Sequence, residues 1–118
     1  MGFLRWFTAN VADTRAGTHA DLGPLTLPGP VPVAAARVRT AVGTLPMWAA
    51  AGGPTDAELH FTRTTRVARY VDDVVVTLEP AGDAVTVHAR SRSRVGKGDL
   101  GQNRRNVLEL WRALTAKA

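Results

Sequence analysis

Apolar and polar residues alternate most regularly between residues 84 and 95, and this alternation predicts a β-strand with one apolar face. Successive side chains of a strand point to opposite sides of the sheet, so the apolar parity marks the face that packs on the core. The two parities are Val85, Val87, Ala89, Ser91, Ser93 and Val95 on one face, and Thr86, His88, Arg90, Arg92 and Arg94 on the other. The pattern therefore predicts a row of three arginines on the outer face of the sheet.

Residues 58–79 also have the composition of β-structure, but they cannot form one continuous strand. At about 3.3 Å per residue such a strand would be roughly 70 Å long, whereas a domain of this size has a radius of gyration of about 13–14 Å. We predict a bend at Asp72 and Asp73, because aspartate tolerates turns and disfavours strand interiors. The predicted strands are 58–70 and 74–79, and a turn at 80–83 leads into the strand 84–95.

Two helices, each with one apolar stripe, are predicted before and after these strands. The first begins near Pro32, which is tolerated in a first helical turn, and ends before Pro46. The second covers about Leu100 to Lys117, and the spacing of Asp99 and Gln102 is typical of a capping box at its start. The stripes are Val31, Ala35, Val38, Val42 and Leu45 in the first helix, and Val107, Leu110, Trp111 and Leu114 in the second.

The order of these elements predicts an α+β fold. We expect an antiparallel sheet of about four strands, with an N-terminal and a C-terminal helix packed on one face. The fourth strand is a short one at 47–51, before the turn formed by Gly52, Gly53 and Pro54. Residues 1–30 lack a sustained period and are expected to form an N-terminal extension and a proline-rich connector. Residues 31–118 are expected to form a single α+β domain.

Composition narrows the class of protein. The 118 residues are 45% hydrophobic and 21% charged, which is typical of one globular domain. The absence of cysteine excludes disulfides, thiolate metal sites and cysteine nucleophiles, and the three histidines have no ligand-like spacing, so neither a metal nor a cofactor is expected. No apolar stretch reaches the roughly 18 residues of a membrane span. A cytoplasmic location is expected, with peripheral membrane association through the apolar segment 3–7 as an alternative.

The net charge of +5 is concentrated near the C-terminal third of the chain. Residues 85–105 contain six basic residues and one acid, Asp99. Arginine pairs well with carboxylates and phosphates, so an anionic partner is one interpretation, and a solvated outer face is the other. Nucleic acid is a less favoured partner, because no aromatic residue for base stacking lies between Tyr70 and Trp111.

Residues 96–101 match the pattern G-x-G-x-x-G at the start of the second predicted helix. The chain has no following parallel strand and no acidic residue about 20 positions later, so the pattern does not indicate a dinucleotide site. Two interpretations remain open. Asp99 caps the helix in a tight turn, or Lys97 and Arg104 hold an anion at the helix N-terminus.

Two longer motifs resemble a known family. They are V-D-D-V at residues 71–74 and R-S-R-S-R-V-G-K-G-D-L-G-Q-N-R-R at residues 90–105. The chain is similar to the bacterial and plastid family called domain of unknown function 1499, over about residues 19–116. Gly98 stands where relatives often have serine. The resemblance implies a fold but no established activity. It draws attention to a set of polar residues at two predicted chain reversals, and these candidate binding residues are Asp72, Asp73, Arg94, Lys97, Asp99, Asn103 and Arg104.

Three functions remain compatible with these patterns. The favoured one is a non-enzymatic binding module for an anionic or amphiphilic small molecule. The second is an enzyme that uses Asp72 or Asp73 as the acid/base, although adjacent residues of a strand face opposite sides and do not form a ready pair. The third is an interaction protein that docks on a partner or a membrane surface through its N-terminal aromatic segment, Phe3 to Phe7.

Overall fold

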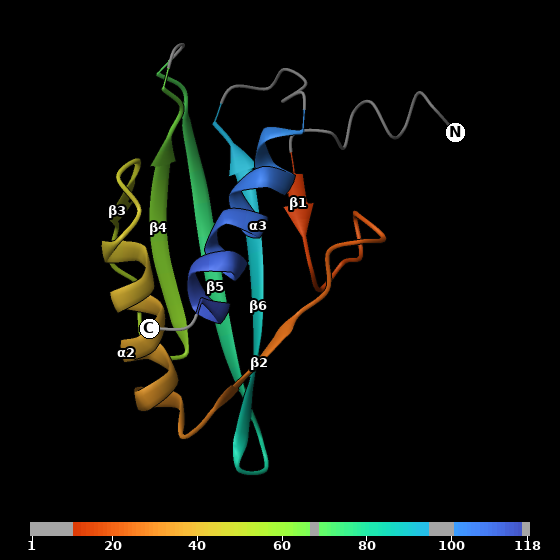
Figure 1. Ribbon diagram of the computed structural model, residues 1–118, viewed down its shortest axis with the longest axis vertical. Helices are drawn as coiled ribbons and strands as arrows, with labels where there is room; N and C mark the ends of the chain where they lie inside the picture. The colour runs from red at the N-terminus through yellow and green to blue at the C-terminus, as the bar shows by residue number, and fades with distance from the viewer. Residues whose placement is uncertain (1–10, 67–68, 95–100, 117–118) are drawn as a thin grey trace.

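The computed structural model describes residues 11–66, 69–94 and 101–116 (Figure 1). The predicted apolar segment 3–7 and the predicted residues Lys97 and Asp99 lie outside the described residues. The elements in chain order are β1 (Val11–Asp13), β2 (Leu25–Pro28), α2 (Val31–Gly43), β3 (Trp48–Ala50), β4 (Glu58–Thr64), β5 (Val71–Ala81), β6 (Ala84–Ser93) and α3 (Gln102–Thr115). They form an α+β fold, as predicted.

The strands form one antiparallel sheet in the order β1-β6-β5-β4-β3, and β2 also pairs with β6. The long strands β5 and β6 run through the middle of the sheet (Figure 1). The predicted number of about four strands is wrong, because the structure has six in the part of the chain that it describes. The two additional strands, β1 and β2, come from the segment 1–30. Each is short and has no regular alternation of apolar and polar residues, and each is stabilised by pairing with β6, which lies much later in the sequence.

The segment 58–79 does bend, but not at the predicted place. The chain reverses between Thr64 and Val71, where the backbone N–H of Thr65 donates to the carbonyl of Tyr70 and the Tyr70 N–H donates to Thr65 Oγ1, both at 2.8 Å. Arg69 adopts the left-handed conformation there, with φ of 58°. The prediction of a bend at Asp72 and Asp73 is wrong, because both aspartates lie inside β5 and have polar partners on other elements.

The alternation in β6 is confirmed. Val85, Val87, Ala89 and Ser91 are buried, whereas Arg90, Arg92 and Arg94 are exposed. In β5 the same face contributes Val74, Val76 and Leu78 to the core. The sheet therefore has one apolar face, and it is the face predicted from the sequence.

Both predicted helices are present. In α2 the buried residues are Ala34, Ala35, Val38, Ala41 and Val42. In α3, Trp111 is 8% exposed. Its Nε1 donates a hydrogen bond to the carbonyl of Gly23 at 2.8 Å, and this bond holds the segment before β2 against the helix. Gly101 occupies the N-cap position with φ of 81°, and α3 begins at Gln102, two residues later than expected.

The helices pack on each other and on the sheet. Helix α3 contacts β6 and β1, and α2 contacts α3, β3 and β5. Figure 1 shows α3 lying across β5 and β6, with α2 beside it. Packing of both helices on one face stays a prediction. Within the described residues, neither helix is long and apolar enough to cross a membrane.

Candidate functional site

A buried polar cluster lies where α3 packs on β5 and β6. Four of its side chains are almost inaccessible: Asp72 is 1% exposed, and Ser91, Asn103 and Asn106 are 0% exposed. Asn106 Nδ2 donates to Asp72 Oδ2 at 2.7 Å and to Ser91 Oγ at 3.1 Å. The Ser91 hydroxyl donates to Asn103 Oδ1 at 2.7 Å. Burying such groups is favourable only when they are hydrogen-bonded, so the cluster specifies how α3 seats on the sheet.

The cluster continues outward to the surface through Gln102. Gln102 Nε2 donates to Asn106 Oδ1 at 2.7 Å, and Arg105 Nη2 donates to Gln102 Oε1 at 3.2 Å. A chain of hydrogen bonds thus connects the buried Asp72 carboxylate with the exposed guanidinium of Arg105. Each bond restricts the rotamers of the next side chain, so the buried cluster orients a surface cation.

Asp73 points to the other face and forms a two-pronged ion pair. Arg94 Nε and Nη2 donate to its two carboxylate oxygens, both at 2.9 Å. Hydrogen bonding and the charge of Arg94 lower the pKa of Asp73 below its ordinary value, and Asp73 raises the pKa of Arg94. This ion pair joins Asp73 in β5 to Arg94, the residue that directly follows β6.

Arg104 pairs with Asp21, a residue of the segment before β2. The hydrogen bond from Arg104 lowers the pKa of Asp21, and Asp21 raises the pKa of Arg104. The five predicted residues that the structure describes thus do not share one cluster. Asp72 and Asn103 belong to the buried cluster, Asp73 and Arg94 form an exposed pair, Arg104 has a separate partner, and Lys97 and Asp99 lie outside the described residues.

The predicted arginine row on the outer face is largely compensated by acids. Arg94 pairs with Asp73, and Arg90 Nε lies 3.9 Å from Asp13 Oδ2. On the same side of the sheet, Arg15 pairs with Glu79, whose Oε1 is 3.8 Å from His88 Nε2. Alternating charges of this kind favour the interpretation of a solvated face over that of a polyanion-binding face.

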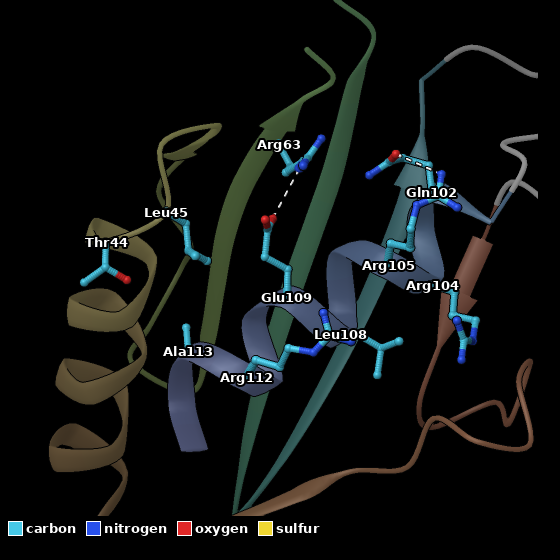
Figure 2. Close-up of a pocket in the computed structure, with 10 residues that line it drawn as sticks. All are labelled: Thr44, Leu45, Arg63, Gln102, Arg104, Arg105, Leu108, Glu109, Arg112 and Ala113. Atoms are coloured by element: carbon cyan, nitrogen blue, oxygen red, sulfur yellow. Dashed lines mark hydrogen bonds and ion pairs between the residues drawn. The ribbon is translucent and has the colours of Figure 1, made fainter. Parts of the chain in front are cut away.

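A groove on the opposite side of the molecule combines arginines with apolar side chains (Figure 2). It has a volume of about 700 Å³ and opens to solvent between α3, β4 and the residues that directly follow α2. It is lined by Thr44, Leu45, Arg63, Gln102, Arg104, Arg105, Leu108, Glu109, Arg112 and Ala113. Four arginines thus face one acid, and Leu45, Leu108 and Ala113 supply apolar surface between them.

The acid of the groove, Glu109, already has two partners. Its Oε1 accepts a hydrogen bond from Trp48 Nε1 at 2.5 Å and lies 3.4 Å from Arg63 Nε. Arg63 is mostly buried, with 15% of its side chain exposed, whereas Arg105 and Arg112 are exposed. Arg104, Arg105 and Arg112 of α3 thus line the groove beside one carboxylate, which already contacts Trp48 and Arg63.

Most of these groove residues were not predicted as site residues. Of the five predicted residues within the described part of the chain, Arg104 alone lines the groove. The spacing of Arg105, Leu108 and Arg112 by three and four residues places them on one face of α3, away from the buried stripe. That spacing was the available signal, but the part played by Arg63 and Leu45 depends on how the sheet and α2 meet α3. Among the described residues, no group of three His, Asp or Glu side chains is placed to hold a metal ion.

The fold and the groove define a class: a small α+β protein in which a buried amide and carboxylate cluster backs an arginine-lined surface groove. A family model described as "Protein of unknown function (DUF1499)" matches residues 7–114. The chain belongs to this family, as its two motifs indicated. No curated protein and no solved structure matches the chain significantly.

Proposed function

We propose that the protein is a binding module for an anionic or amphiphilic small molecule, and that the groove between α3, β4 and the end of α2 is its site. The observation that carries this proposal is the excess of arginine around an apolar floor. Arg105 and Arg112 are exposed at the groove, and Leu108 lies between them on the same helix face. Guanidinium groups bind carboxylates and phosphates in two-pronged geometry, and the apolar floor suits the remainder of such a ligand.

The size of the groove supports a small ligand. Its volume of about 700 Å³ falls within the range of roughly 300–1,000 Å³ that small-molecule sites occupy. Arg105 donates a hydrogen bond to Gln102, and Gln102 is hydrogen-bonded to Asn106. These bonds fix the position of the Arg105 guanidinium before a ligand binds. Such preorganisation reduces the entropy lost on binding.

The enzymatic alternative has less support. Asp72 is 1% exposed and is bonded to Asn106, so a substrate has little access to its carboxylate. Asp73 is paired with Arg94, which lowers its pKa and makes it a weaker base. Neither aspartate lines the groove.

Titration with phenyl phosphate, a compact anion with one apolar ring, tests the proposed function. We expect saturable binding by calorimetry, with backbone amide NMR shifts centred on Arg105, Leu108 and Arg112. Arg105→Ala is expected to weaken binding about tenfold or more, because it removes a charge-assisted hydrogen bond. Arg92→Ala, an exposed arginine of β6 outside the groove, is the matched control and is expected to bind normally. Absence of saturable binding, or equal loss in both variants, would contradict the proposal.

A further inference from the structure

A second hollow continues the groove along the seam between the two helices. It also has a volume of about 700 Å³, and its lining includes Arg37, Thr40, Ala41 and Leu114. Thr44 and Ala113 line both hollows. The two hollows are therefore neighbouring parts of one channel that is open to solvent, with Thr44 and Ala113 at the junction.

The chemistry of this channel changes along its length. Among the described residues, the first hollow is lined by four arginines and one glutamate, whereas Arg37 is the one charged residue that lines the second. Arg37 is already engaged, because its Nη2 donates to the Leu114 carbonyl at 3.0 Å. The remaining lining of the second hollow is threonine, alanine and leucine. Cationic groups thus gather at one end, and small or apolar side chains follow from the junction onward.

We propose that the ligand is a single-chain amphiphile with an anionic head and an unbranched hydrocarbon tail. The head binds Arg105 and Arg112, and the tail crosses the junction at Thr44 and Ala113 into the second hollow. This inference rests on the proposed function and adds the tail and its path. Charge complementarity specifies the head, and the small side chains at the junction leave room for a narrow chain rather than a bulky group. The occupant is a dispersed single molecule and not a bilayer surface, since the channel runs between two helices.

Alkyl phosphates of increasing length test the inference, because they share one head and differ only in the tail. Ethyl, hexyl and decyl phosphate are titrated below their micelle-forming concentrations. Full burial of a methylene would raise affinity about fourfold. In a channel with one open side we expect about twofold per methylene, half of that free energy.

Two variants place a bulky side chain at the junction. Ala113→Phe and Thr44→Phe are each expected to abolish the dependence on tail length, so that decyl phosphate binds no more tightly than ethyl phosphate. Thr44 is exposed, so its replacement tests the path even where Ala113→Phe disturbs folding. Ala36→Phe, on an exposed position of α2, is the matched control and is expected to keep the dependence.

The possible outcomes separate the tail from the head. Equal affinity for ethyl and decyl phosphate would contradict the proposed binding of the tail in the second hollow. It would not contradict the anion site of the proposed function. Failure of every phosphate to bind overturns both. A length dependence that survives both junction variants places the tail elsewhere and overturns the inference. Binding to anionic vesicles without binding of dispersed decyl phosphate overturns it as well.

Discussion

Asp72 and Asp73 are neighbours in β5 with opposite environments. Asp72 is buried and accepts a hydrogen bond from Asn106 of α3, whereas Asp73 is exposed and paired with Arg94. The alternation of a strand predicts the opposite orientations, but not the burial. The carboxylate of Asp72 is tolerated in the core because the side-chain amide of Asn106 in α3 donates a hydrogen bond to it. Asn106 lies 34 residues further along the chain, so no local pattern identifies it as a partner.

The buried cluster makes a prediction about its two serines. Ser91 is 0% exposed and bonds to both Asn103 and Asn106, so Ser91→Ala removes one hydrogen-bond partner from each of two buried amide groups. We expect a loss of about 1–3 kcal/mol in the free energy of unfolding. Ser93 accepts one bond from Asn103 and is partly exposed, so water can replace its hydroxyl. Urea denaturation that shows equal costs for Ser91→Ala and Ser93→Ala would rule out this account of the cluster.

At the scale of elements, the periodic patterns of apolar residues predicted most of the helices and strands. The stripes of α2 and α3 and the alternation of β6 followed from spacing within one segment, and the short strand β3 was predicted from its place before a turn. The strands β1 and β2 did not, because pairing with β6 rather than their own composition makes them strands. The prediction placed the chain reversal before β5 too late in the sequence. Aspartate is typical of turns, whereas the residues that close the actual turn, Thr65 and Tyr70, are not.

The turn between β3 and β4 contains Gly53, and we expect its replacement by alanine to be more destabilising than the same change at Gly82. Gly53 has φ of 128°, and a Cβ there would lie 2.3 Å from the carbonyl oxygen of Glu58. Gly53→Ala should therefore move the backbone and cost about 2–4 kcal/mol. Gly82, in the turn between β5 and β6, has φ of 66° but open space around it. Gly82→Ala should cost only about 1–2 kcal/mol, the conformational part alone. Thermal unfolding of the two variants checks this order, and a reversed order would contradict it.

At the scale of the whole molecule, ion pairs join segments that are distant in the sequence. Arg104 of α3 binds Asp21 before β2, and Arg94 after β6 binds Asp73 in β5. The candidate site also depends on the tertiary fold, since the groove is lined by residues of β4, α3 and the end of α2. The sequence indicated an excess of arginine and, as one of two interpretations, an anionic partner. It did not indicate which arginines share a surface, because that depends on the packing of α3.

These two ion pairs predict how stability responds to acid. Both pairs lower the pKa of the aspartate below the ordinary value of 3.8. Their stabilisation is therefore present above that value and is lost as the pH falls through the lowered pKa of the folded protein. The double variant Asp21→Asn, Asp73→Asn should be slightly less stable than the wild type at pH 7, and this difference should shrink as the pH falls below 3.8. The difference is small because the aspartate side chains are about half exposed, at 54% and 49%.

Urea midpoints measured between pH 7 and pH 2 check this prediction. High salt supplies the control, because it screens exposed charges and should shrink the difference at pH 7. A difference that grows as the pH falls, or that is unaffected by salt, would contradict the assignment of these ion pairs.

The position of β6 in the sheet has a consequence for how the chain folds as it is made. One edge of β6 pairs with β5, and the other pairs with β1 through residues 90–92 and with β2 through residues 84–87. Synthesis begins at the N-terminus, so β1 and β2 leave the ribosome well before their partner exists. β1 and β2 can pair with β6 only after β6 has been made, so we expect the hairpin of β5 and β6 to form before β1 and β2 pair with its free edge. Such late, non-local pairing slows folding, and the N-terminal strands complete the sheet last.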